Sequence, residues 1–99
     1  MAALLFLKTR VDLSRCAVKD LNKVPKHIKI KLLSWVEVVE KDGLESVRKI
    51  PGYHDEPLKG SRVGQRSIRL SRSYRAIYEV ISSGPPRIVE VQEVNKHEY

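Results

Sequence analysis

The sequence predicts an α+β domain: an N-terminal strand, a two-helix hairpin and then a three-stranded antiparallel meander. Apolar residues recur at steps of three and four through the first half of the chain, a spacing that is typical of helices. The second half instead contains three short runs rich in β-branched residues, as strands do. The chain has 99 residues, of which 41% are hydrophobic and 31% charged, so we expect residues 1–99 to form one folded domain.

The first elements are expected to be a strand and a short helix. Segment 4–13 is loosely apolar, and Ser14 then suits the N-cap of a helix over 15–21. Cys16 lies in this helix, where we expect a small buried residue. As the only cysteine it cannot form an intramolecular disulfide, which favours a reducing compartment such as the cytoplasm. The apolar start of the chain is too short to span a membrane, so no membrane partner is expected.

A second helix is expected to begin after Pro25, because the N–H that proline lacks is not needed in a first helical turn. Gly43 suits the stop after about Asp42, and one or two further turns should follow before Pro51. The helix carries one apolar face: Ile28, Leu32, Trp35, Val36 and Val39. Trp35 should therefore lie in the core, with the hairpin packed on one face of the sheet.

The three strands of the meander are predicted at 67–70, 76–81 and 88–94. Short polar links around Ser71-Arg72-Ser73 and Ser83-Gly-Pro-Pro86 join them, so neighbouring strands should pair antiparallel. Tyr78 in the second strand is expected to be a core residue.

Basic residues outnumber acidic ones and gather in one window of the chain. The formal net charge is +7, which favours a polyanionic partner. Residues 58–78 contain no acidic residue but hold Lys59, Arg62, Arg66, Arg69, Arg72 and Arg75. The planar fork of arginine suits phosphate oxygens, so we expect these six to bind phosphate.

A second basic group lies on the expected helical hairpin, where only Asp20 opposes it. Its members are Lys19, Lys23, Lys26, Lys29 and Lys31. Either a solvated face or a general attraction to a nucleic-acid backbone would account for it.

Three groups of residues could together supply an acid, a base and an anion clamp. In chain order they are His54 with Glu56 and Lys59, Arg69 with Arg75, and His97 with Tyr99. A last strand that lies beside the earlier ones would bring the end of the chain near the arginines.

At these residues the chain resembles the RelE/ParE superfamily of small bacterial toxins, and within it the branch that cleaves messenger RNA on the ribosome, which includes RelE, YoeB and HigB. Asp55-Glu-Pro-Leu-Lys-Gly60 is similar to a YoeB loop in which an acidic residue precedes Pro-Leu-Lys-Gly. Gly64-Gln-Arg-Ser-Ile-Arg-Leu-Ser71, followed by Tyr74-Arg75, resembles a HigB and YoeB strand pair with two arginines six positions apart. Asn95-Lys-His-Glu-Tyr99 is similar to the His-Tyr ending of YoeB. With Asp20-Leu-Asn-Lys-Val-Pro25, the likeness covers nearly the whole chain.

The resemblance implies a RelE-like microbial RNase fold and the toxin of a type II toxin–antitoxin system, an mRNA interferase that inhibits translation. Its substrate would be the A-site codon of a translated message, in which a ribose 2′-hydroxyl attacks the neighbouring phosphate. The implied partners are a cognate antitoxin with an acidic segment, the ribosome and mRNA, and operator DNA for the toxin–antitoxin complex. No metal or cofactor is implied, because the nucleophile is already in the RNA.

The resemblance also implies roles for single residues. Glu56 matches the base, Arg75 the arginine that stabilises the phosphate, and His97 the acid. Arg69 matches a second phosphate contact, and Lys59 is a further cation. Tyr99 would orient the substrate or stack on it. Arg66 stands where related sequences often carry an aromatic residue.

Some alternatives stay open at this point. His54 could replace Glu56 as the base, since imidazole titrates near neutral pH. The fold would also suit a ParE-like inhibitor of gyrase, and the charge alone would suit a non-catalytic basic module that binds RNA or an acidic protein.

Overall fold

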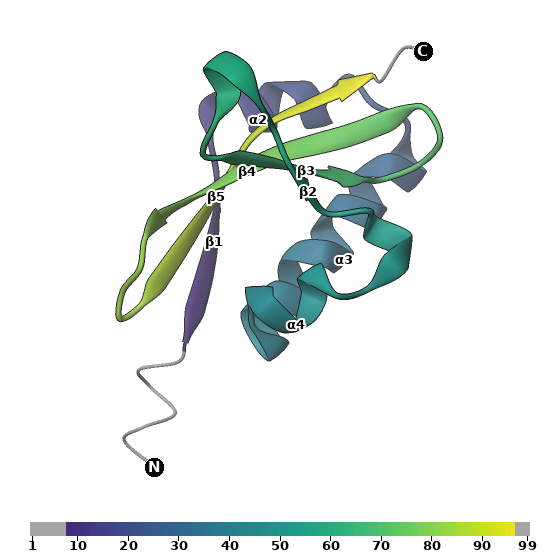
Figure 1. The fold of residues 1–99 in the computed structure, drawn as a ribbon. Coiled ribbons are helices and arrows are strands. Elements are labelled where there is room, and N and C mark those ends of the chain that lie inside the picture. Colours follow the sequence, from purple (N-terminus) through teal and green to yellow (C-terminus); the bar gives the residue numbers. More distant parts are fainter. Residues whose placement is uncertain (1–7, 97–99) are drawn as a thin grey trace.

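The computed structural model describes residues 8–96, which form a five-stranded mixed sheet with helices packed against it (Figure 1). The first half contains β1 (Thr9–Leu13), α2 (Arg15–Leu21), α3 (Lys26–Asp42) and α4 (Leu44–Arg48). The second half contains β2 (Glu56–Pro57), β3 (Gln65–Arg69), β4 (Tyr74–Ser82) and β5 (Arg87–Lys96). Single 3₁₀ turns at Pro51–Tyr53 and Gly60–Arg62 flank β2. The predicted α+β class is confirmed, whereas His97 and Tyr99 lie outside the described residues.

The strands are ordered β1-β5-β4-β3-β2 across the sheet. β3, β4 and β5 form the predicted antiparallel meander, and β1 pairs with β5 in parallel. The two-residue strand β2, which pairs with β3, was not predicted, because a strand of two residues has no periodicity to detect. It is nevertheless the element that fixes one side of the candidate site.

The short helix α2 begins directly after Ser14, the N-cap predicted from the sequence. The Ser14 hydroxyl accepts a hydrogen bond from the Ala17 N–H at 3.0 Å and donates one to the Gln92 carbonyl at 2.8 Å, which ties the helix to β5. Ala17 and Leu21 face the core. Cys16 lies one residue off that face and is exposed, so the expectation of a buried cysteine was wrong.

The long helix α3 follows Pro25 and buries the predicted apolar face. Its buried residues are Ile28, Leu32, Trp35 and Val39. The helix ends at Asp42 and is capped by Gly43, whose φ of +88° favours glycine and whose N–H donates to the Val39 carbonyl at 2.9 Å. The Trp35 and Tyr78 rings pack with their centroids 5.2 Å apart, so both core predictions are confirmed.

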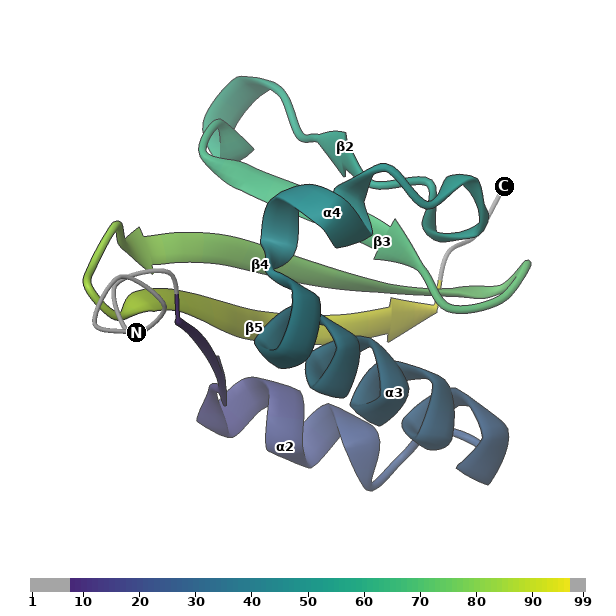
Figure 2. The same cartoon turned by 90° about the horizontal axis from the view of Figure 1, so that it is seen from below.

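The core lies between the helices and one face of the sheet. Figure 2 shows α2 and α3 on the same side of β4 and β5. From the sheet, Ile68 of β3, Leu70 just after it, and Ala76 and Tyr78 of β4 enter this core at alternate positions. The intervening residues face the other way, so that side of the sheet is free to carry polar side chains.

Candidate active site

A small pocket opens where the β3–β4 hairpin meets the segment around β2. His54 and Glu56 line it from that segment, and Arg69 and Arg75 line it from the two strands. Arg72, Ser71, Tyr74, Ser67 and Ile68 complete the lining. The volume, about 50 Å³, admits a few water-sized groups and therefore suits one phosphate rather than a whole nucleotide. The fold thus brings together five candidates from the sequence: His54, Glu56, Arg69, Arg72 and Arg75.

Two arginines face each other across the antiparallel pair of β3 and β4. Arg69 and Arg75 are direct partners in the register, so their side chains leave the same face with Cβ atoms roughly 5 Å apart. Like charges in this position repel each other. Within residues 8–96 neither makes an ion pair, and the Arg75 Nε is buried without a hydrogen-bond partner. An anion bound between them would relieve the repulsion and satisfy this donor.

The hairpin turn holds a third arginine next to this pair. The Leu70 and Ser71 N–H groups donate to the Tyr74 carbonyl at 2.9 and 3.2 Å. The Ser71 hydroxyl accepts from the backbone N–H groups of Ser73 and Tyr74 at 3.1 and 3.2 Å. These bonds hold the turn closed and leave Arg72 exposed at its tip, beside the pocket.

Glu56 reaches the pocket because β2 pairs with β3. It stands opposite Ser67 in the register, which places its side chain on the same face as Arg69, two residues further along β3. His54 approaches from the same segment with a left-handed backbone, φ +48°, which is uncommon for a residue other than glycine. Both side chains are exposed and line the pocket, so either can receive a proton there.

A buried carboxylate between these two residues anchors the segment. The Asp55 side chain is 1% exposed, and it accepts hydrogen bonds from the Arg66 Nε at 2.6 Å and from the Tyr78 hydroxyl at 2.5 Å. Asp55 thereby ties the backbone of His54 and Glu56 to β3 and β4. Burial alone would lower the pKa of Arg66, but the hydrogen bond and charge of Asp55, together with Tyr78, outweigh burial and raise this pKa.

This anchor was not predicted from the sequence, although one signal indicates it. A tyrosine that is buried needs a partner for its hydroxyl, and Asp55 is one of the two acidic residues that directly precede the basic window. Arg66, expected among the phosphate-binding residues, forms the ion pair with Asp55 in this cluster.

The Asp55 anchor should make folding stability sensitive to alkaline pH. Burial, and then the hydrogen bond to Asp55, raise the pKa of Tyr78 above its usual value. The folded chain therefore keeps a proton that the unfolded chain loses above pH ~10, and stability falls above that pH by up to about 1.4 kcal/mol per pH unit. Urea unfolding at about pH 8 and about pH 11 should show a smaller loss for Tyr78→Phe than for the wild type.

Tyr53→Phe is the control for this measurement, because its hydroxyl has no such partner among the described residues and the variant should follow the wild type. Equal losses for wild type and Tyr78→Phe would mean that the phenol does not hold its proton through Asp55.

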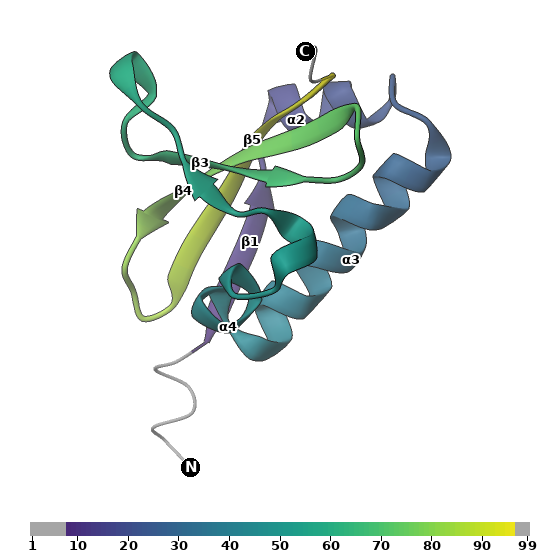
Figure 3. The same cartoon turned by 45° about the vertical axis from the view of Figure 1, so that its right-hand side comes forward.

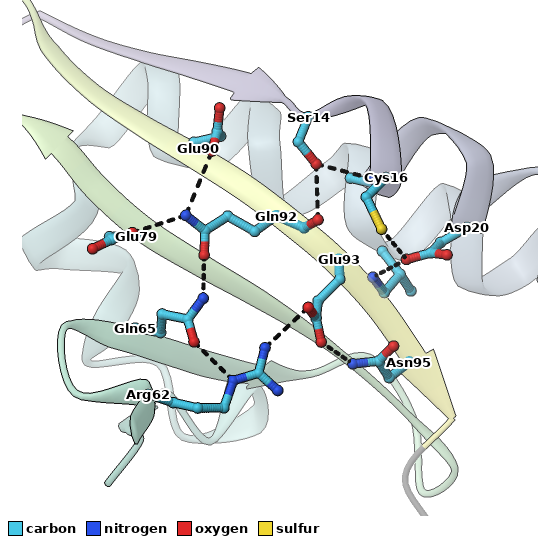
Figure 4. Close-up of polar contacts among 12 residues, drawn as sticks. Ser14, Cys16, Asp20, Arg62, Gln65, Glu79, Glu90, Gln92, Glu93 and Asn95 are labelled. Carbon is cyan, nitrogen blue, oxygen red and sulfur yellow. Dashed lines mark hydrogen bonds and ion pairs between the residues drawn. The ribbon is translucent and has the colours of Figure 1, made fainter. Parts of the chain in front are cut away.

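The remaining basic candidates are placed outside the pocket. Arg62 donates to Gln65 Oε1 at 2.8 Å and pairs with Glu93 at 2.9 Å, within a polar network on the open face of the sheet (Figure 4). Burial alone would raise the pKa of Glu93, but hydrogen bonds from Asn95 and Arg62 hold this pKa below its usual value. Lys59 is exposed beside the second 3₁₀ turn.

The end of β5 lies beside the two arginines. Asn95 is opposite Arg75 in the register, and Lys96 is opposite Tyr74. The expectation that the last strand approaches the arginines therefore holds as far as Lys96. Asn95 also donates to Glu93 at 2.5 Å, so the polar network of Figure 4 continues from Arg62 to the edge of the site.

Neither a metal cluster nor a membrane span is found in the described part of the chain. Residues 8–96 contain no group of three or more His, Cys, Asp or Glu side chains that could hold a metal ion. None of the helices described is long and apolar enough to cross a bilayer.

No protein-family model matches the chain, and no curated protein sequence does. Solved structures do resemble it. The YafQ structure from E. coli strain BL21(DE3) superimposes with a TM-score of 0.71 at 17% identity, covering 91% of this chain and 94% of that one. The toxin–antitoxin complex RelBE2 from Mycobacterium tuberculosis gives 0.67 at 20% identity, with 92% and 100% covered. The archaeal RelE–RelB complex from Pyrococcus horikoshii gives 0.67 at 21%, with 91% and 96% covered. The chain therefore has the RelE-like toxin fold.

Proposed function

We propose that this chain, whose fold is that of the RelE-like toxins, is the toxin of a type II toxin–antitoxin system and acts as an endoribonuclease on ribosome-bound mRNA. The observation that carries the proposal is the pocket, which joins Glu56, a carboxylate without an ion pair in residues 8–96, to the facing pair Arg69 and Arg75. A carboxylate can act as the general base for an attacking 2′-hydroxyl, and two arginines beside it can stabilise the charge that develops on the phosphate.

In this mechanism the scissile phosphate lies between Arg69 and Arg75. Glu56 takes the proton from the 2′-hydroxyl, whose oxygen attacks the adjacent phosphorus and leaves a cyclic phosphate. Arg75 stabilises the charge that gathers on the non-bridging oxygens, and the departing 5′-oxygen takes a proton from His97. The nucleophile belongs to the RNA, so these steps require no metal.

The other cations contribute mainly to binding. Arg72 at the tip of the β3–β4 turn and Lys59 beside the second 3₁₀ turn would attract neighbouring phosphates of the message, and Tyr99 would orient the substrate or stack on a base. Arg62 and Arg66 are engaged by Glu93 and Asp55, so we assign them to holding the site in place rather than to direct phosphate contact.

The partners follow from the same proposal. Some of the similar structures are complexes of a toxin with its antitoxin, such as DinJ–YafQ from E. coli and YoeB–YefM from Staphylococcus aureus. We propose a cognate antitoxin with an acidic segment for this chain, operator DNA as a ligand of that complex, and the cytoplasm as the place of action.

A second candidate function comes from another similar structure. The YoeB/ParE toxin from Agrobacterium tumefaciens superimposes with a TM-score of 0.66 at 20% identity, covering 90% of this chain and 99% of that one. Its name joins the RNA-cleaving branch to the ParE branch, so inhibition of gyrase is the rival function.

The deciding experiment adds the purified protein to a translating extract and maps the ends of a defined message. Cuts at a fixed position within codons, in the reading frame, are expected, and the same RNA without ribosomes should stay intact. Intact message together with inhibited supercoiling by gyrase would favour the ParE-like function. If the message stays intact and gyrase is not inhibited, the proposed nuclease is refuted and a basic binding module remains as the function.

A further inference from the structure

An apolar groove lies on the helical hairpin, apart from the candidate active site. It is formed by the end of α2, the connecting segment and the first turns of α3, and Figure 3 shows this connection at the edge of the molecule. Its apolar lining comes from Leu21, Val24, Ile30 and Leu33. Its volume, about 490 Å³, is far larger than the pocket at Arg75 and suits side chains of a partner rather than one small group.

The outward residues of α3 in this groove lie outside the buried core. Ile30 and Leu33 are 53% and 43% exposed, and neither belongs to the buried core that Ile28 and Leu32 enter from the other face of the helix. Single exposed apolar residues are ordinary, but these two lie side by side in one hollow. Such a patch is typical of a surface that a partner covers.

Lysines surround this groove, and no described acidic side chain neutralises them. Lys26 and Lys29 line it, Lys23 precedes it, and none of the three forms an ion pair within the described range. The nearest acidic residue in the sequence, Asp20, is turned toward the sheet, where it accepts a hydrogen bond from the Val94 N–H at 2.9 Å. The groove is therefore apolar inside and positive at its rim.

We propose that this groove docks an amphipathic helix of a partner protein that carries acidic residues beside its apolar stripe. Apolar residues of such a helix at spacings of three and four would fill the hollow between Val24, Ile30 and Leu33, and its carboxylates would meet the lysines. Nucleic acid fits less well, because its phosphates would pair with the lysines but would cover Ile30 and Leu33 without an apolar contact.

The inference deepens the proposed function, on which the identity of the partner rests: for a toxin, this partner is the antitoxin. The groove lies outside the pocket, so the partner can hold the toxin at this face whether or not another of its segments covers Arg69 and Arg75. Binding at the groove can be measured without any cleavage.

The test uses a synthetic helical peptide of about 18 residues, with Leu at positions i, i+4, i+7 and i+11 and Glu beside them, and a scrambled peptide of the same composition. Fluorescence anisotropy with the full chain should show binding of the helical peptide only. Ile30→Ser/Leu33→Ser should weaken it roughly tenfold or more, and Lys26→Glu/Lys29→Glu likewise. The matched control, Val63→Ser/Ile81→Ser, removes two exposed apolar side chains that lie outside the groove. This variant should bind the peptide like the wild type.

The proposal would be overturned if the helical peptide did not bind, if the scrambled peptide bound as tightly as the helical one, or if the groove variants bound the helical peptide as tightly as the wild type. Thermal unfolding checks that these variants fold. The proposal would also be overturned if Ile30→Ser/Leu33→Ser weakened the binding of a single-stranded RNA oligonucleotide as much as that of the peptide. That result would assign the face to nucleic acid. The same variant should cleave translated message at the wild-type rate. Peptide binding without any cleavage by the wild type would refute the proposed nuclease but leave the groove as a docking site.

Discussion

The Arg75→Ala variant is expected to fold normally and to cleave ribosome-bound message about 10²–10³ times more slowly, the usual effect of losing one electrostatic donor to a transition state. The Arg75 Nε has no hydrogen-bond partner among the described residues, and Arg69 faces it with the same charge. Removing the side chain therefore breaks no described ion pair and relieves a repulsion, so the thermal midpoint should not fall.

Single-turnover cleavage with saturating ribosomes measures this loss, and two variants serve as comparisons. Arg15→Ala removes an exposed arginine of α2 outside the pocket and should keep the wild-type rate, which controls for the change in net charge. Arg69→Ala should weaken binding as well as the rate, because a ground-state phosphate contact contributes to both. Wild-type cleavage by Arg75→Ala would show that the reaction takes place elsewhere.

The Glu56→Gln variant is expected to lose about 10²–10⁴ in rate, because glutamine keeps the size of the side chain but cannot accept the 2′-proton. Glu56 is exposed and held by the backbone pairing of β2 with β3, so its replacement should leave the fold unchanged. The pH profile of the wild type should be bell-shaped, and the variant should lose the acid limb. The general acid sets the alkaline limb of the profile. If His97 is this acid, as proposed, His97→Ala should remove the alkaline limb.

His54→Asn distinguishes the rival base, since asparagine tolerates the left-handed backbone that His54 adopts. With Glu56 as the base, His54→Asn should keep the acid limb that Glu56→Gln removes. If His54→Asn abolishes the acid limb and Glu56→Gln does not, the two roles are reversed.

Much of the helical half was predictable because its signals are local. Ser14 caps its own helix, Pro25 begins the next, and the buried residues from Ile28 to Val39 repeat at the spacing that one helix face requires. Gly43 ends α3 by its own backbone preference. The same holds for β4 and β5, whose runs of Val, Ile and Tyr predict extended chain without knowledge of their partners.

The candidate site depended on pairing between distant segments, which the sequence determines only in part. The six-residue spacing of Arg69 and Arg75 and the short link between them indicated a hairpin, but only the register shows that they are direct partners. The charges of the basic window were evident from composition, yet only packing decided which are free. Arg62 and Arg66 form ion pairs with Glu93 and Asp55, carboxylates that other segments supply, whereas Arg69 and Arg75 form no ion pair within residues 8–96.

By itself, then, the sequence determined the kinds of elements, their order and the types of residues that could act on a phosphodiester, because each of these depends on neighbours within a few positions. The tertiary structure alone decided that β1 pairs with β5, that β2 brings Glu56 opposite Ser67, and that a buried Asp55 holds this segment. These contacts join residues that are far apart in the chain, and their free energy comes from burial and hydrogen bonding that exist only after the sheet has formed.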